Sequence, residues 1–498
     1  MARNEENAWT RRSPGGPRRP LKSSACAAAL GLLAACAPSG SAQGPADVRP
    51  APIYRFEGDV QLRNGAAFHY LAILVRDPGA PGGYLGTIDI PKQALAGAAL
   101  EAVAFEPGAG VEFALNAAGH PRWSGAYDTD GTLVCEFRQS DVRLPCSMRE
   151  VKDVRPGRAE PPQREQTPLP PFPYTSEEAR YVNPTLHVQL SGTLTLPAGA
   201  GPHPALIVIG DRGMQDRDCS FAGHRPWLVL ADYLARAGIA VLRVDPRGAG
   251  GGVPSTRGFD GVALESDVES GLALLRNRPE VDAHRLGLLA HGYAGSVAIG
   301  LSNRPGVAFI VLLAPPALPG RELLARQHEL AVLDAGASPL EAASVREDVG
   351  AAIAIIESDS DPAHVRERLT TFSESLIARN RPKPPSLTLN QMLSLAEAPG
   401  FRELARHDPV PLLRALRDPV LVLVPGLDRE VDPADNLPVL RAALAQNPDA
   451  RIETLPRLNH GFQSAEAVTP TDPERLSETF APAALERIAT WIRQVSSR

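Results

Sequence analysis

The sequence predicts an α/β protein in which a mostly parallel sheet with flanking helices follows a smaller β-rich domain. From His187 onward, apolar strand-like runs alternate with amphipathic helical segments, a pattern typical of βα units. Residues 51–150 instead contain short β-prone runs broken by Gly, Pro and Asn. A proline-rich and charged stretch, Pro156–Pro173, separates the two parts and indicates a domain boundary.

The β-rich domain is expected over residues 51–150. Its clearest strand-like runs are Tyr54–Leu62, Ala67–Val75 and Val111–Leu115. It contains no acid pair and no metal-ligand spacing, so its sequence indicates no chemistry. The segment that follows, 151–175, is predicted to be an extended, semi-rigid linker.

The α/β domain is expected over residues 176–498, with apolar runs as strands and one-sided apolar segments as helices. The predicted strands are Val188–Leu196, Ala205–Gly210, Ile239–Asp245, Leu286–Ala290, Phe309–Ala314, Pro419–Val424 and Ile452–Leu455. The predicted helices are Pro226–Ala237, Val262–Arg276 and Ala484–Val495. Residues from about 321 to 410 are helical without a clear strand, and we expect them to form a lid inserted over the sheet.

The amino terminus has the features of a secretory signal of the lipoprotein type. Basic residues precede an apolar run, Ala25–Ala35, that is too short to cross a bilayer permanently. This run ends in Leu-Ala-Ala-Cys36, which resembles the bacterial lipobox; an alanine-rich signal with a chance cysteine is the alternative. We therefore expect residues 1–35 to be removed, Cys36 to carry lipid and residues 36–50 to be a flexible tether. The protein would be exported and lipid-anchored to the bacterial cell envelope, on its periplasmic face or surface.

Export bears on the cysteines, because oxidising compartments permit disulfides. Cys135 and Cys146 lie in two strand-like runs around a polar turn, VCEFRQSDVRLPC, and are expected to pair across a hairpin. Two independent buried thiols are the alternative. Cys26 would leave with the signal peptide, and Cys219 would remain unpaired.

One strand-turn-helix stretch carries a catalytic pattern without its nucleophile. Residues 285–300, RLGLLAHGYAGSVAIG, join an apolar strand to a helix of small residues. In the pattern G-x-S-x-G, such a turn presents a nucleophilic serine at the top of a sheet. Here Gly292 occupies the serine position, and a glycine has no atom that can attack a carbonyl. Glycine also adopts the strained backbone of such a turn at little cost. An ordinary strand-to-helix turn is the alternative interpretation of these residues alone.

Two loops supply the acid and the base that acyl transfer requires. The segment VLVPGLDREVDP places Asp428 just after an apolar strand, and LPRLNHGFQ places His460 after the next strand. The order of nucleophile position, acid and base along the chain matches serine hydrolases built on a strand-turn-helix nucleophile. A loop Asp or His by itself is more often structural, but the ordered pair downstream of the turn favours a catalytic constellation.

These motifs together resemble those of exported bacterial α/β-hydrolases of the serine-aminopeptidase-like and esterase-like group. The segments that carry the resemblance are Gly210–Asp218, Val229–Gly250, the turn at 285–300, Phe309–Pro316, Gly426–Pro438 and Leu458–Gln463. It covers roughly residue 170 to the carboxyl end, and the preceding β domain also resembles the one that this group carries. The resemblance implies the α/β-hydrolase fold with a helical lid. It further implies a serine hydrolase of small esters, or of amides, with Asp428 as the acid and His460 as the base.

The chain departs from this family pattern at two places in one active centre. Members commonly read G-H-S-E-G-G at the turn, where this chain has Gly292 in place of the serine and Tyr293 after it. At the oxyanion loop the usual G-S-G head is replaced by Asp211, Arg212 and Gly213, while the tail Q-D-R-D is kept. A carboxylate at Asp211 would oppose an oxyanion unless Arg212 neutralises it.

Two functional hypotheses of different classes follow. The first is a lipid-anchored α/β-hydrolase-fold protein that is catalytically impaired and keeps its lidded pocket as a binding site for a small ester or another small ligand. The second is an active carboxylic-ester or amide hydrolase that uses Asp428 and His460 with water or Cys219 as the nucleophile. Ser296, one helical turn beyond Gly292, is expected to point into helix packing. A purely structural envelope protein is a third possibility.

Composition excludes several partners. The net charge of −6 provides no basic field for nucleic acid. The histidines outside the acid-base pair have no metal-ligand spacing, and we expect neither a metal nor a cofactor. The only membrane contact expected is through the lipid on Cys36.

Overall fold

The structure is a computed structural model of the chain. It describes residues 53–62, 67–76, 83–90, 95–115, 120–128, 133–140, 142–151, 164–210, 216–221, 223–247, 261–302, 304, 306–378, 389–397, 400–465 and 476–497. The expected signal peptide, Cys36, the tether and the oxyanion-loop head Asp211–Gly213 lie outside these residues.

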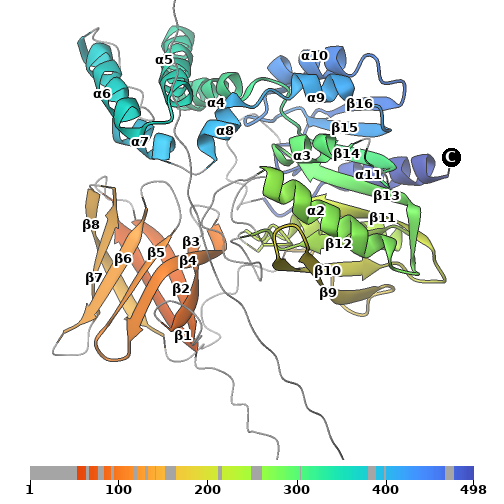
Figure 1. The fold of residues 1–498 in the computed structure, drawn as a ribbon, viewed down its shortest axis with the longest axis horizontal. Coiled ribbons are helices and arrows are strands. Elements are labelled where there is room, and N and C mark those ends of the chain that lie inside the picture. The colour runs from red at the N-terminus through yellow and green to blue at the C-terminus, as the bar shows by residue number, and fades with distance from the viewer. Residues whose placement is uncertain are drawn as a thin grey trace, which may run out of the picture. The chain divides into compact units, whose positions relative to one another are not determined.

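The β-rich domain is a closed antiparallel barrel of eight strands (Figure 1). The strands are β1 (Ile53–Gln61), β2 (Ala67–Arg76), β3 (Tyr84–Ile90), β4 (Leu95–Glu106), β5 (Gly110–Leu115), β6 (Arg122–Tyr127), β7 (Leu133–Gln139) and β8 (Val142–Glu150). Each strand pairs with the next, and β8 closes the barrel onto β1. Alternate side chains point inward, and the largest of the fully buried ones are Trp123, Tyr70, Phe56 and Phe113. The predicted runs at 54–62, 67–75 and 111–115 are confirmed as β1, β2 and β5.

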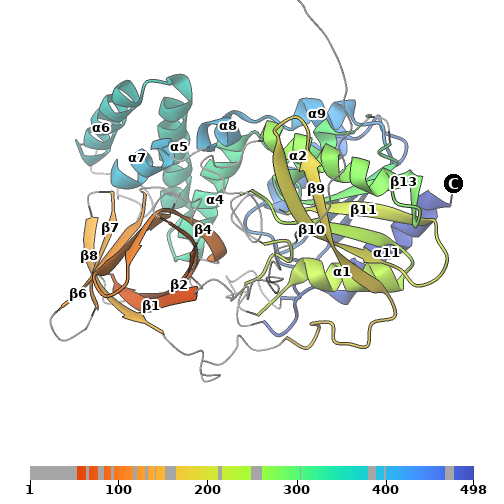
Figure 2. The ribbon, with the colours of Figure 1, turned by 60° about the horizontal axis from the view of Figure 1, so that its bottom comes forward.

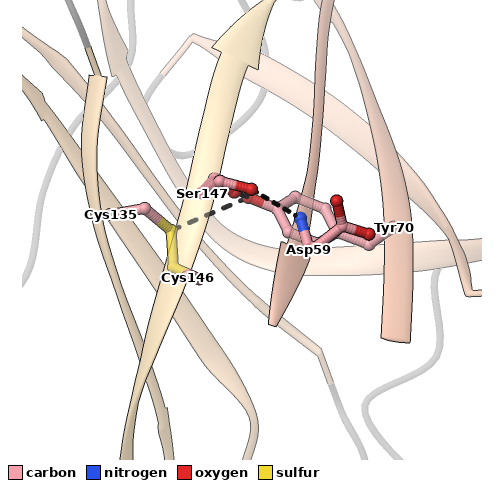
Figure 3. The surroundings of a disulfide bond; sticks show 5 residues. All are labelled: Asp59, Tyr70, Cys135, Cys146 and Ser147. Carbon is pink, nitrogen blue, oxygen red and sulfur yellow. Dashed lines mark hydrogen bonds between the residues drawn. A yellow bond between two sulfur atoms is a disulfide. The ribbon is translucent and has the colours of Figure 1, made fainter. Parts of the chain in front are cut away.

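The barrel closes at a point where two strands approach closely. A Cβ on Gly58 of β1 would lie 1.8 Å from the carbonyl oxygen of Ser147 of β8, so only glycine fits there. Tyr70 Oη donates to that same carbonyl over 2.9 Å (Figure 3). Next to it, the disulfide Cys135–Cys146 joins directly opposed positions of β7 and β8, with Cα atoms 5.1 Å apart. The expected pairing of these two cysteines is confirmed.

The second sheet has eight strands in the order β16-β15-β14-β13-β11-β12-β10-β9. They are β9 (Thr175–Asn183), β10 (Val188–Leu196), β11 (His203–Ile209), β12 (Ala240–Val244), β13 (Val281–His291), β14 (Phe309–Leu313), β15 (Val420–Pro425) and β16 (Ala450–Leu455). The six neighbouring strands β16, β15, β14, β13, β11 and β12 pair in parallel. Strand β10 runs antiparallel to both of its neighbours, β12 and β9. This arrangement confirms the predicted mostly parallel sheet.

Helices cover both faces of this sheet (Figures 1 and 2). Helices α1 (Pro226–Arg236) and α11 (Pro482–Ser496) pack their apolar sides on one face. The other face is covered by α2 (Gly261–Arg276), α3 (Ala294–Gly300), α9 (Val410–Ala415) and α10 (Pro433–Ala443). Because both faces are buried, the central strands read as continuous apolar runs rather than as alternating ones.

Helices inserted between β14 and β15 form a separate apolar cluster. They are α4 (Gly320–Asp334), α5 (Pro339–Ser358), α6 (Pro362–Ala378), α7 (Leu389–Glu397) and α8 (Phe401–Arg406). Helix α5 begins at a capping box. The Ser338 hydroxyl accepts from the backbone N–H of Glu341, and the Glu341 carboxylate accepts from the backbone N–H of Ser338. The helical character expected for residues 321–410 is confirmed in the described parts of this range, 321–378, 389–397 and 400–410.

Part of the predicted linker is attached to the α/β domain. The Gln166 amide donates to the carbonyl of Phe480 over 2.7 Å and accepts from the backbone N–H groups of Thr479 and Phe480. Tyr174 donates to Asp232 of α1 over 2.8 Å. Residues 164–174, within the segment predicted to be an extended, semi-rigid linker, therefore pack against the α/β domain.

Candidate active site

The turn between β13 and α3 has the backbone of a nucleophile elbow. Gly292 has a φ of +55°, in the left-handed region that side chains disfavour. Its N–H donates to the carbonyl of Leu313 at the end of β14 over 2.9 Å, which fixes the turn to the sheet edge. Tyr293, directly after it, is 5% exposed and packs against the lid helices. The structure thus places Gly292 at the tip of a strained strand-to-helix turn, as the sequence predicts.

Asp428 and His460 come together at the same edge of the sheet. Asp428 follows β15 and His460 follows β16, and His460 Nδ1 donates to Asp428 Oδ2 over 2.8 Å. The Asp428 side chain is fully buried. Its second oxygen, Oδ1, accepts from the backbone N–H groups of Glu430 and Val431, both over 2.8 Å. The carboxylate is held by three hydrogen bonds and fixes the orientation of the imidazole.

The base lies against the elbow. His291, which precedes Gly292, donates from Nε2 to the carbonyl of His460 over 3.0 Å. The two imidazole rings have centroids 4.5 Å apart. The ends of β13, β15 and β16 therefore bring the nucleophile position, the acid and the base to one place.

The loop that carries His460 is braced by two residues that sequence reasoning missed. Asn459 Oδ1 accepts from the N–H of Gln463 over 2.9 Å, and Asn459 Nδ2 donates to Gln463 Oε1 over 3.1 Å. Gln463 is buried and also donates to the carbonyl of Glu478 over 2.8 Å. The amide side chains flanking His460 in L-N-H-G-F-Q are the signal that could have found this brace.

A third residue that sequence reasoning missed is Glu430. Its carboxylate oxygen Oε2 lies 3.6 Å from His460 Nε2, the atom that would take a proton from a nucleophile. It follows Asp428 by two residues, and its proximity to His460 depends on the path of two separate loops.

Residues 216–218, the described part of the expected oxyanion loop, are anchored to the sheet by charged side chains. Arg217 donates to Asp245 from its backbone N–H over 2.9 Å and from Nε over 3.0 Å, and it also pairs with Glu178 over 2.7 Å. Burial opposes the charge of Arg217, but its hydrogen bonds to Asp245 and Glu178 raise its pKa above the ordinary value. Beside it, Arg243 pairs with Asp218; burial, and then the charge of Arg217, lowers the pKa of Arg243 to about 10.

Two other candidate nucleophiles lie in this domain. Cys219 is half-buried, forms no disulfide and packs against the α1 and α11 side of the core. Ser296 does not simply point into helix packing, as the sequence had led us to expect, because its Oγ bonds His407 Nε2 over 2.6 Å. Burial lowers the pKa of His407. His407 follows α8, and this bond joins the elbow helix to the lid.

Two features are absent from the described part of the chain. In that part, no group of three or more His, Cys, Asp and Glu side chains is placed to hold a metal ion. No described helix is both long and apolar enough to cross a membrane.

The strand order and the position of the site define the class of protein. The second strand of the sheet is antiparallel, the third and fourth exchange places, the elbow follows the fifth strand, and the acid and base follow the seventh and eighth. This is the α/β-hydrolase fold, preceded by an antiparallel β-barrel.

Comparison with known proteins agrees with an esterase-like α/β-hydrolase. The chain is 24% identical over 278 residues to the esterase EstD of Thermotoga maritima, an alignment that covers 56% of this chain and 59% of EstD. The match thus spans less than two thirds of this curated relative. No family model matches the sequence.

Solved structures with some likeness include the Pyrococcus furiosus esterase Pf2001 and the α/β-hydrolase GrgF from a Penicillium species. Pf2001 is 14% identical with a TM-score of 0.38, and the match covers 64% of this chain and 91% of Pf2001. GrgF is 16% identical with a TM-score of 0.40, and the match covers 65% of this chain and all of GrgF. Because these TM-scores are low, the fold is assigned from the strand order and not from the superpositions.

Proposed function

We propose that this protein binds a small ester or a related small molecule at the elbow and does not perform acyl-enzyme chemistry. The observation that carries this proposal is Gly292, which stands at the tip of the elbow beside an assembled Asp428–His460 pair. Acyl transfer needs a side-chain nucleophile whose proton the base removes. Without it, the base can act only on water, and the residual rate is expected to be low.

The test is hydrolysis of short-chain p-nitrophenyl esters by the wild type and by Gly292→Ser. The serine variant is expected to gain turnover, because a hydroxyl would stand at the tip of a turn adjacent to the loop of His460. The wild type is expected to be no faster than His460→Ala. Gly292→Ala is the matched control, since it adds a side chain without a hydroxyl. Wild-type turnover that His460→Ala abolishes would overturn the proposal.

A second candidate function, an active hydrolase, is favoured by the 2.8 Å bond between His460 and Asp428. In that case the nucleophile would be water or Cys219. Wild-type turnover that depends on His460 but survives Cys219→Ser would assign water. Turnover lost in Cys219→Ser and on thiol blocking would assign the thiol.

The export and lipid anchor form a separate part of the proposal. They are supported by the basic segment, the short apolar run and the Leu-Ala-Ala-Cys36 sequence. The full-length protein should incorporate labelled palmitate and sediment with membranes, and Cys36→Ser should do neither. Release of the wild type as an unlipidated soluble protein would contradict this part alone.

A further inference from the structure

The outward side of His460 is occupied by a carboxylate. Asp428 Oδ2 lies 2.8 Å from Nδ1 of the imidazole, and Glu430 Oε2 lies 3.6 Å from Nε2. The exposed fractions of these side chains are 0% for Asp428, 14% for His460 and 61% for Glu430. The three residues therefore form a row from the core to solvent, with the imidazole between two carboxylates.

The backbone of Glu430 is fixed by hydrogen bonds, which place its Cα in the loop beside His460. Its N–H donates to Asp428 Oδ1 over 2.8 Å. Its carbonyl accepts from the side-chain amide of Gln327, on lid helix α4, over 2.8 Å. The position of the Glu430 backbone thus follows from the same loop geometry that fixes the Asp428 carboxylate.

Two arginines near this loop form ion pairs with carboxylates other than Glu430. Arg429 pairs with Asp334 at the end of α4. Arg326 of α4 pairs with Asp432 and Asp435, each over 2.7 Å. Within the described ranges, no Lys or Arg is paired with Glu430. Asp428 and Glu430 together carry two negative charges, and His460 supplies at most one positive charge.

We propose that the elbow site selects ligands that carry a positively charged group, such as ammonium-bearing esters, and that Glu430 is the residue that recognises the charge. A ligand that reaches His460 from solvent meets the exposed carboxylate, which attracts a cation and repels an anion. This inference rests on the proposed function for the location of the ligand site.

The test uses two probes of the same shape, acetylcholine and 3,3-dimethylbutyl acetate, in which carbon replaces the charged nitrogen. Each is titrated into the wild-type protein while the imidazole NMR signals of His460, assigned with His460→Ala, are followed. We expect acetylcholine to bind up to about fivefold more tightly than the neutral ester, the upper end of the range for an exposed charge pair. Added salt should reduce this preference. In Glu430→Gln the two probes should bind equally.

The control is Glu486→Gln, which removes one exposed carboxylate from α11 on another part of the domain. It should keep the preference for acetylcholine. Equal binding of the two probes to the wild type, or a preference that survives Glu430→Gln, would overturn the inference. If neither probe shifts the His460 signals while Gly292→Ser hydrolyses neutral esters, the inference fails and the proposed function stands. Wild-type ester turnover that His460→Ala abolishes would instead overturn the proposed function itself.

Discussion

The loops after β15 and β16 and the turn after β13 meet at one edge of the sheet, but they differ in the catalytic groups that they carry. The two loops retain the acid, the base and the bonds that hold them. The turn retains the backbone of a nucleophile elbow, with Gly292 at φ +55°, but has no nucleophile. Fold and chemistry are therefore separable at this edge, because the fold depends on many backbone bonds and the chemistry on one oxygen.

The physical reason lies in what each change would leave behind. Replacing a serine by glycine at the turn removes a strained side chain and leaves no buried polar group without a partner. Removing the carboxylate of Asp428 would leave the N–H groups of Glu430 and Val431 and the Nδ1 of His460 without their acceptor. The pairing of Asp428 with His460 therefore has a structural role that does not depend on a nucleophile at the turn.

The largest effect is expected where chemistry is restored and the acid is then removed. In the Gly292→Ser background, Asp428→Asn should lower kcat by about 10⁴-fold, because the amide favours the wrong tautomer of His460. The measurement is p-nitrophenyl ester turnover. Asp361→Asn, an exposed lid carboxylate, is the control and should leave kcat unchanged. A loss of less than tenfold in Asp428→Asn would mean that His460 does not act as the base.

The expected oxyanion loop extends the comparison between retained structure and missing chemistry, because its tail, Gln215–Asp218, matches the family pattern. Arg217→Ala should lower the free energy of unfolding by about 3 kcal/mol, because it removes the guanidinium that is hydrogen-bonded to the buried carboxylate of Asp245. Arg138→Ala removes an exposed pair with Glu136 and should cost less than about 1 kcal/mol. Urea denaturation compares the two. Equal costs would show that the anchor of the loop is not structural.

The brace of the His460 loop should have a smaller effect. Gln463→Ala removes a buried amide that bonds Asn459 and the carbonyl of Glu478, and it should cost about 2 kcal/mol of unfolding free energy. Gln494→Ala, at an exposed position of α11, should change stability by less than about 0.5 kcal/mol. Chemical denaturation measures both. If Gln463→Ala leaves the free energy of unfolding unchanged, Gln463 does not stabilise the loop of His460.

The smallest effect concerns the contact of the elbow helix with the lid. Because burial lowers the pKa of His407 in the folded protein, the unfolded chain binds its proton first as the pH falls. Stability from this group is therefore complete above the unfolded pKa of about 6.5 and is lost as the pH falls through the lowered folded pKa. His407→Gln should flatten this part of the pH dependence in urea denaturation between pH 7.5 and 5. An unchanged slope would contradict the assignment.

Sequence was sufficient for the features that have strong local patterns. The apolar runs of the central strands, the turn at Gly292 and the ordered Asp428 and His460 were all predicted from the sequence, because buried parallel strands and their loops leave clear signals. Edge strand β9, TSEEARYVN, was missed, since only Ala179 and Asn183 are buried in its otherwise polar run. Helix α10 was also missed.

Contacts between distant segments could not be predicted in this way. Ser296 bonds His407, which lies 111 residues further along the chain. Glu430 reaches His460 only because the loops after β15 and β16 fold toward each other. Such pairings depend on tertiary geometry, for which a single sequence carries no local signal.

The most direct measurement is covalent labelling by a small fluorophosphonate, which reacts with a serine that an adjacent histidine activates. Intact-mass analysis would compare the wild type, Gly292→Ser and Gly292→Ser/His460→Ala. The account predicts no adduct on the wild type, one adduct on Gly292→Ser and none on the double variant. A wild-type adduct that depends on His460 would contradict the central claim, because it would show that the acid-base pair already serves another nucleophile.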